Sequence, residues 1–176
     1  ELSQDVPFSE IVHKAKAQGY TEPDPRDDLS GMDVARKVVI LAREMGLSLE
    51  LSDLTVQNLV PEELQGTSSI DTFMERLSEF DEGIMKRVSD ANQADEVLRY
   101  VGVIQPDGPC KVALRSYPKT HAFARIQGSD NIIAFRTKRY NQQPLIVQGP
   151  GAGPAVTAGG VFADLLRLAA HLGAPS

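Results

Sequence analysis

The feature that most constrains this chain is a segment rich in charge and proline, residues 19–37, which leads directly into the apolar run from Val38 to Ala42. Proline fixes its own φ angle and biases the preceding residue toward extended backbone. Pro23 and Pro25 therefore predict a stiff arm from Glu22 to Pro25 that is not helical. Because the arm stands beside a core-forming stretch, we expect its carboxylates to be held in place at a site.

A helix is expected to follow the arm. Apolar side chains recur at helical spacing between Gly31 and Met45, and Gly46 is a natural C-terminal stop. Asp28 or Ser30 is a suitable N-cap, since either side chain can accept a hydrogen bond from a free backbone N–H group of the first turn. The pattern predicts a core helix whose first turn lies next to the arm.

Asp33 and Lys37 lie four positions apart on that helix, so their side chains share one face near its N-terminus. The two groups can therefore act on one ligand. Acid-to-lysine pairs at this spacing also decorate many solvated helices, where each adds only about 0.2–0.5 kcal/mol. The pair alone does not decide between a site and an ordinary surface.

The surrounding segment resembles the signature of the homoserine dehydrogenase family. That signature places small, aromatic, acidic, proline and glycine residues at fixed spacing before a final aspartate and lysine. It is met without a gap by Ala15, Gly19, Tyr20, Thr21, Asp24, Pro25, Asp28, Leu29, Gly31, Asp33 and Lys37.

The resemblance implies the NADPH-dependent reduction of L-aspartate 4-semialdehyde to L-homoserine, and its reverse. Such chemistry needs a proton-exchanging group near the reacting oxygen and an anion for the substrate ammonium. Position by position, the resemblance makes Lys37 the catalytic proton donor or acceptor and Asp33 a catalytic and substrate-binding acid that could hold Lys37. Glu22 is expected to bind the substrate amino group, with Asp28 and Tyr20 as further substrate-binding residues.

A second glycine-rich segment runs from Gln148 to Val161. Glycines feeding a helix expose backbone N–H groups and the positive end of the helix dipole, although many plain turns share this composition. The segment lacks the spacing and the βαβ context of a dinucleotide fingerprint. In the resembled family a similar turn closes over the nicotinamide cofactor, which makes Gly153 and Gly151 expected NADP (or NAD) contacts. Gly19 is expected to approach the substrate or cofactor with its backbone.

The remaining pattern predicts an α+β fold, with helices packed on one face of a largely antiparallel or mixed sheet and a C-terminal helix that closes it. We assign residues 1–176 to one catalytic and dimerisation domain. The expected helices are Pro7–Gln18, Gly31–Met45, Ser69–Ala91 with a break near Asp81 to Gly83, and Val156–Leu172, the last with Val161, Leu165, Leu168, Ala169 and Leu172 buried and with Gly173 and Pro175 as stops. The expected strands are Leu54–Leu59, Val97–Ile104, Lys111–Tyr117, Ala122–Gln127, Asn131–Arg136 and Pro144–Gln148, with a turn at Gly128 to Asp130 joining the fourth strand to the fifth.

Composition excludes several classes of protein. A formal net charge of −6 disfavours binding to nucleic acid, and a single cysteine, Cys110, excludes an internal disulfide framework and a multi-cysteine zinc site. There is no apolar run of membrane-spanning length, and because the N-terminal residues are polar and acidic we expect no signal or transit segment among them. We expect no metal site in this chain and no membrane partner.

The chain does not begin with methionine, so we expect it to be a piece of a longer protein. The resemblance implies a missing N-terminal Rossmann-like part, which in the family carries the glycine fingerprint and a monovalent-cation site, so the chain alone should be inactive. Ser129 to Phe135 and Leu172 to Ser176 are similar to the plant or algal type, in which the dehydrogenase is the C-terminal part of a bifunctional aspartokinase. That implies a chloroplast stroma, and otherwise a cytoplasmic location.

Two alternatives stand beside this reading. Asp24, Asp27 and Asp28 could hold Mg²⁺ in a different NADP-dependent oxidoreductase or lyase, although Arg26 sits among them. The chain could instead be a structural module that forms a homodimer through its sheet region, from Val97 to Phe135.

Overall fold

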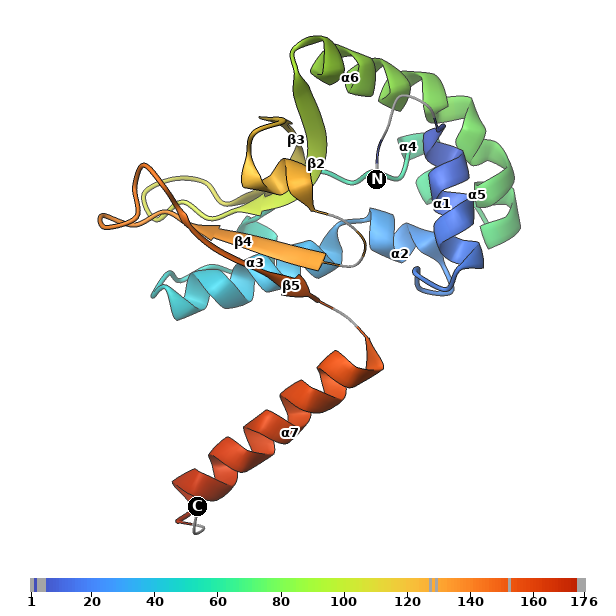
Figure 1. Ribbon diagram of the computed structural model, residues 1–176. Coiled ribbons are helices and arrows are strands. Elements are labelled where there is room, and N and C mark those ends of the chain that lie inside the picture. Colours follow the sequence, from blue (N-terminus) through green and yellow to red (C-terminus); the bar gives the residue numbers. More distant parts are fainter. Residues whose placement is uncertain (1, 3–5, 127, 129, 152, 174–176) are drawn as a thin grey trace. The chain divides into compact units, whose positions relative to one another are not determined.

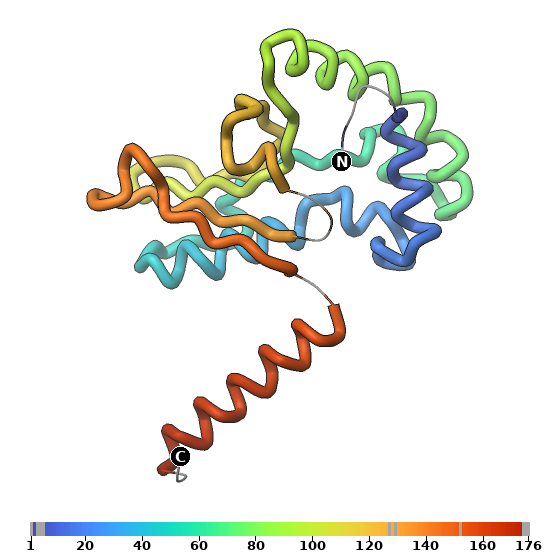
Figure 2. Tube along the Cα trace, viewed as in Figure 1, coloured from blue at the N-terminus to red at the C-terminus, as the bar shows by residue number. Residues whose placement is uncertain are grey.

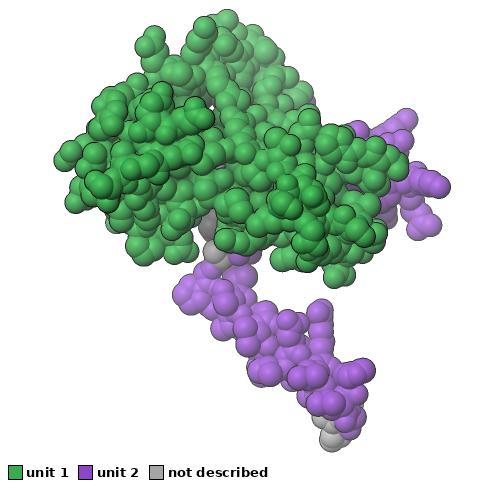
Figure 3. Space-filling model, turned by 180° about the vertical axis from the view of Figure 1, so that it is seen from behind, with its two compact units in different colours: residues 1–119 green, residues 120–176 purple. Residues whose placement is uncertain are grey.

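A computed structural model describes residues 2, 6–126, 128, 130–151 and 153–173 of the chain. The chain divides into two compact units, Glu1–Lys119 and Thr120–Ser176, coloured separately in Figure 3. The mixture of helices with small sheets and a C-terminal helix confirms the α+β class (Figure 1).

The first unit contains most of the helices and a three-stranded mixed sheet. In that sheet β3 is central, paired in parallel with β1 and antiparallel with β2. The helices are α1 Phe8–Ala17, α2 Pro25–Leu29, α3 Met32–Glu44, α4 Glu62–Gln65, α5 Ile70–Arg76 and α6 Asp81–Gln93, with 3-10 turns η1 Leu51–Asp53 and η2 Leu77–Phe80. The strands are β1 Thr55–Val56, β2 Glu96–Val103 and β3 Lys111–Pro118.

Most elements of this unit confirm the sequence reading, and the differences have local causes. Ser69 caps α5 as predicted, by accepting a hydrogen bond from the Thr72 N–H at 3.0 Å. The helix after it breaks at η2, just before the expected position. The strand predicted over Leu54–Leu59 shrinks to the two residues of β1, because the chain leaves the sheet toward the proline turn at Pro61.

The apolar side chains of the first unit form packed clusters among its helices and between its helices and its sheet. One cluster joins α1 to the α4 and α5 region and contains Phe8, Val12, Val60, Leu64, Phe73, Met74 and Leu77. Another joins α3 to the sheet and contains Ala35, Val38, Cys110 and Val112. Val112 in the central strand is fully buried, so α3 is held by the sheet it covers.

The second unit consists of η3 Ala122–Arg125, β4 Asp130–Phe135, β5 Leu145–Pro150 and α7 Pro154–His171. The prediction of a strand at Ala122–Gln127 is wrong for its described residues. The Phe123 N–H donates to His121 Nδ1 at 3.1 Å, and the two rings meet edge to face, which starts a 3-10 turn there. The strand β4 pairs antiparallel with β5 instead. Gln127 and Ser129, which complete the predicted strand and turn, lie outside the described residues.

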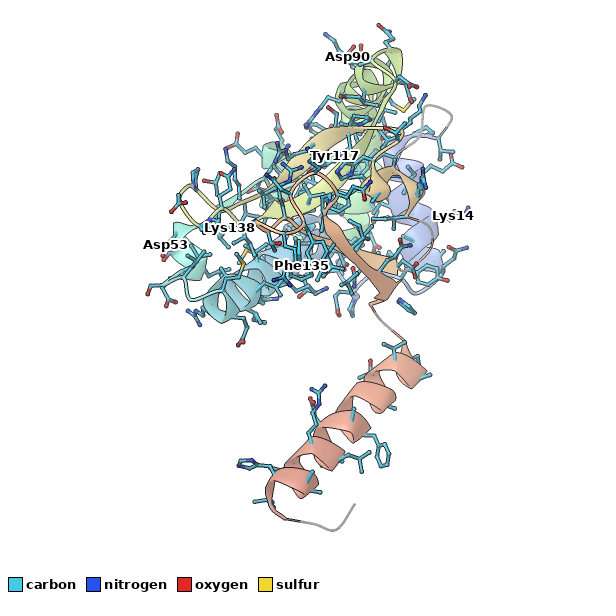
Figure 4. The ribbon with its side chains drawn as sticks, turned by 60° about the vertical axis from the view of Figure 1, so that its left-hand side comes forward. Lys14, Asp53, Asp90, Tyr117, Phe135 and Lys138 are labelled. Carbon is cyan, nitrogen blue, oxygen red and sulfur yellow. The ribbon has the colours of Figure 1, made fainter. Side chains whose placement is uncertain are left out.

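The C-terminal helix α7 confirms the predicted helix, but the prediction that one face is buried is wrong. None of its residues, all of which the structure describes, is buried, and Leu165 and Leu168 are 58% and 54% exposed. Figure 4 shows its side chains projecting from the helix on all sides. Periodic apolar residues predict a helix, whereas burial also requires a partner. The expected stop at Pro175 lies outside the described residues.

No helix within the described ranges combines the length and the apolar character needed to cross a bilayer.

Candidate active site

The segment predicted to form the site passes from the end of α1 through the arm into α2 and α3, a path traced in Figure 2. At its start Gly19 adopts a left-handed φ of +71°. The Gly19 N–H donates to Lys16 O and the Tyr20 N–H to Ala15 O, both at 3.0 Å, the pattern of a Schellman C-cap. This turn ends α1 and leaves the Tyr20 side chain 75% exposed.

The arm itself is held by Asp28. The Asp28 Oδ2 accepts a hydrogen bond from the Glu22 N–H at 2.9 Å, and the Thr21 hydroxyl donates to Glu22 O at 2.9 Å. Both bonds engage the backbone of Glu22, so its exposed carboxylate stays available. Asp28 therefore acts on the arm and is not the N-cap of the core helix.

The predicted arm is one residue too long, because Pro25 is the first residue of a short helix, α2. Proline suits a first helical position, where its missing N–H costs nothing. Asp24 is the N-cap and accepts a hydrogen bond from the Arg26 N–H at 3.0 Å. The N-cap of α3 is Gly31 rather than Asp28 or Ser30, which corrects the sequence reading.

Arg26 fixes α2 to the rest of the unit. Its guanidinium pairs with both oxygens of Asp24, with Nη2 at 2.6 Å from Oδ2 and Nε at 3.0 Å from each oxygen. Its Nη1 donates to the Thr67 O and Oγ1 at 2.8 and 3.1 Å, and its Cζ lies 5.7 Å from the ring centre of Phe73. The hydrogen bond from Arg26 lowers the pKa of Asp24, and the Asp24 carboxylate raises the pKa of Arg26.

Asp33 and Lys37 lie on α3 as predicted, one helical turn apart, and both are exposed. Asp33 pairs with Arg36, whose Nη1 lies 3.2 Å from Oδ1, and the two side chains are 63% (Arg36) and 73% (Asp33) exposed. The bond that Asp33 makes is therefore to Arg36, not to Lys37. Such an exposed pair is weak, so Asp33 can exchange it for a ligand at little cost.

The glycines expected to contact a cofactor belong to the second unit. Gly153 is the N-cap of α7 with φ of +132°, followed by Pro154 at the first helical position. A Cβ at Gly151 would overlap the Asn131 side-chain amide, so the Asn131 side chain can lie against this backbone only because residue 151 is glycine. Ala152 lies outside the described residues.

The described part of the chain offers no group of three or more His, Cys, Asp or Glu side chains able to hold a metal ion. Of the three carboxylates considered for Mg²⁺, Asp24 is committed to Arg26 and Asp28 to the arm. These contacts weigh against the alternative of a magnesium site in the arm.

Two shallow pockets lie elsewhere. One is lined by Phe135, Thr137, Lys138, Arg139, Tyr140 and Leu145, of which Figure 4 labels Phe135 and Lys138. The other lies where α6 meets β2 and β3 and is lined by residues that include Arg87, Asp90 and Glu96. Neither lining, within the described residues, includes a predicted site residue.

Sequence reasoning missed the role of Arg26, which it treated only as a charge that argues against a metal. The N-cap pattern of Asp24 followed by Pro25 is a signal for the start of α2. Nothing local points to Thr67, which lies 41 positions away from Arg26 in the sequence.

Known proteins resemble this chain over most of its length. The sequence profile described as homoserine dehydrogenase matches residues 1–166. The chain is 62% identical over 170 residues to the chloroplastic bifunctional aspartokinase/homoserine dehydrogenase 1 of Arabidopsis thaliana, covering 96% of this chain and 19% of that protein. It is 44% identical over 172 residues to the homoserine dehydrogenase of Saccharomyces cerevisiae, covering 97% and 48%.

Solved structures give the same result for the fold. A Candida auris protein described as of unknown function matches with a TM-score of 0.89 and 45% identity, over 95% of this chain and 48% of that one. The Staphylococcus aureus homoserine dehydrogenase matches with a TM-score of 0.72 at 23% identity, over 96% and 38%, which supports the fold alone. The chain thus spans 19% of the bifunctional plant relative and 48% of the yeast enzyme. With its signature segment in the predicted place and its profile matched over residues 1–166, the chain belongs to the homoserine dehydrogenase family.

Proposed function

We propose that this chain supplies the substrate-binding and acid–base residues of an NADP-dependent homoserine dehydrogenase, which interconverts L-aspartate 4-semialdehyde and L-homoserine. The observation that carries the proposal is that the charged residues within 19–37 form two groups, one bound into the structure and one exposed. Asp24 and Arg26 are bound into the structure, whereas Glu22, Asp33 and Lys37 are exposed. Charged groups held on a rigid backbone, with their ionic ends open, suit a charged substrate.

Each exposed group has a role that its chemistry fits. The Lys37 ammonium donates a proton to the substrate oxygen during reduction and accepts it back in the reverse direction. The Glu22 carboxylate binds the substrate ammonium, and Asp28 keeps the arm in place through the Glu22 N–H. Asp33 leaves Arg36 to contact the reacting end of the substrate, and the exposed Tyr20 is a further substrate-binding residue.

The proposed cofactor is NADP, or NAD, which supplies or accepts the hydride when bound. Gly151 and Gly153 would contact it through backbone atoms, and Gly19 would approach the substrate or cofactor at the end of α1. The Rossmann-like part and the monovalent-cation site are proposed for the remainder of a longer parent chain. By analogy with the plant relatives, whose names include aspartokinase and chloroplastic, that parent also carries an aspartokinase and works in the plastid.

The test compares two exposed helical lysines in the parent enzyme. Lys37→Ala should lower the rate of homoserine-dependent NADP reduction by about 100-fold or more, the scale of a lost general acid–base group. Lys86→Ala, which removes an exposed lysine from α6, should leave the rate within about 2-fold, as most surface substitutions do. Near-normal turnover of a folded Lys37→Ala enzyme would refute the assignment.

A second role, dimerisation, is favoured by the β4–β5 hairpin. An isolated two-stranded sheet is marginally stable in water, yet this one exposes Phe135, Leu145 and Val147 by 36%, 46% and 52%. We propose that the sheet region contributes to a homodimer. The variant Val147→Asp should convert the parent from dimer to monomer in analytical ultracentrifugation, and an unchanged mass would exclude this surface.

A further inference from the structure

Helix α3 meets strand β2 at two points where a side chain would normally intervene. A Cβ on Gly31, the N-cap residue with φ of +75°, would overlap the Tyr100 hydroxyl and lie 2.8 Å from its Cζ. A Cβ on Gly102 would overlap the Cγ2 of Val38. Tyr100 and Gly102 share a face of β2, and Gly31 and Val38 lie seven positions apart, on one stripe of the helix. Two such contacts fix the rotation of α3 as well as its position.

Tyr100 is itself held by a closed set of bonds. Its hydroxyl donates to Gln57 O at 2.7 Å, and the Gln57 Oε1 accepts from the Leu114 N–H at 3.0 Å. Leu114 is the cross-strand partner of Tyr100. Beyond the end of β1 at Val56, Gln57 continues the pairing with β3 through its N–H, which donates to Val112 O at 2.8 Å, and through its side chain. Burial raises the pKa of Tyr100, so its hydroxyl remains a donor at neutral pH.

The rotation of α3 decides where its charged side chains point. Asp33 and Lys37 directly precede Val34 and Val38, about 100° around the helix from the stripe that packs on the sheet. We propose that Tyr100 is a positioning residue for the reaction, because its hydroxyl sets the rotation of α3 and thereby the direction of the Lys37 ammonium. This inference rests on the proposed function of Lys37.

The first test is Tyr100→Phe in the parent enzyme, which keeps the ring and removes the hydroxyl. It should lower kcat by about 10-fold, less than the ~100-fold that a 1 Å misplacement can cost. KM should change by less than about 2-fold, because the interaction lost acts in the transition state. Tyr117→Phe is the matched control, because Tyr117 lies on the neighbouring strand β3 and is labelled in Figure 4. Tyr117 is also partly buried, and burial raises its pKa. This control should leave kcat within about 2-fold.

The second test repeats Tyr100→Phe in a Lys37→Ala background. If Tyr100 acts through Lys37, the double variant should be about as slow as Lys37→Ala alone. If the fold-losses in kcat of the two single variants multiply in the double variant, or if Tyr100→Phe alone has a normal kcat, the positioning role is overturned and the proposed function stays intact. A near-normal Lys37→Ala enzyme would overturn both. Should Tyr100→Phe fail to fold, Val38→Ala loosens the second contact and should lower kcat in the same Lys37-dependent way.

Discussion

Asp24 and Asp33 belong to one continuous segment, yet the structure uses them in different ways. The Asp24 side chain is 26% exposed, caps α2 and pairs with an arginine that reaches two other parts of the unit. The Asp33 side chain is 73% exposed and makes a single weak ion pair one turn along its own helix. The difference teaches that a dense charge cluster can contain both the groups that hold a site and the groups that work in it.

The largest effect should follow a change in a working group. Glu22→Gln removes the charge proposed to bind the substrate ammonium, and a hydrogen bond to a charged group contributes about 1.5–3 kcal/mol. KM for homoserine in the parent enzyme should therefore rise about 10- to 100-fold, with the free energy of unfolding unchanged. Glu82→Gln, an exposed glutamate on α6, is the control in steady-state kinetics. A KM unaffected by Glu22→Gln would show that Glu22 does not bind the substrate ammonium.

A change in a group that holds the site should lower the free energy of unfolding and have less effect on substrate binding. Asp24→Ala removes the N-cap of α2, and loss of such a cap costs about 1 kcal/mol of stability. Chemical denaturation should detect this loss, while substrate saturation should change less than in Glu22→Gln. If Asp24→Ala lowers kcat strongly with no loss of stability, Asp24 belongs with the working groups.

The pH dependence of stability should test whether Asp24 is a holding group. Because the pKa of Asp24 is lowered from 3.8 in the folded state, its contribution is fully present above that value and is lost as pH falls through the folded pKa. The stability difference between wild type and Asp24→Asn should therefore be constant near neutral pH and shrink below about pH 4. Urea unfolding at a series of pH values measures it. A difference that grows toward acid would contradict the assignment.

The smallest effect is expected for the partner of Asp33. Arg36→Ala breaks an exposed ion pair, and such pairs contribute from about 0 to 1 kcal/mol. The change in the free energy of unfolding should lie within that range, and added salt should reduce it. A loss well above this value in denaturant titrations would mean that the Asp33–Arg36 pair is structural.

The sequence predicts some elements well because their signals are local. Gly31 and Gly46 mark the ends of α3, and the observed helix runs from Met32 to Glu44. The apolar pattern of α7 predicts its helix but not its surroundings, because periodicity identifies a face and not a partner. The strand expected at Ala122 fails because the side chain of His121 satisfies the backbone in a turn.

The candidate site likewise has parts that the sequence predicts and parts that it does not. The sequence predicts Glu22 on the arm and Asp33 and Lys37 on the core helix, and the structure has all three there with exposed side chains. The contacts of Arg26 with Thr67 and Phe73, by contrast, depend on the tertiary packing of segments distant in sequence. No local pattern in the sequence contains that information.

The central claim, that the segment separates holding groups from working groups, is tested most directly by Lys37→Ala in the folded parent enzyme, with turnover and unfolding free energy measured on the same sample. The account predicts that kcat/KM falls about 100-fold or more while the unfolding free energy stays within about 0.5 kcal/mol of wild type. Normal turnover, or a loss of activity that tracks a loss of stability, would contradict it.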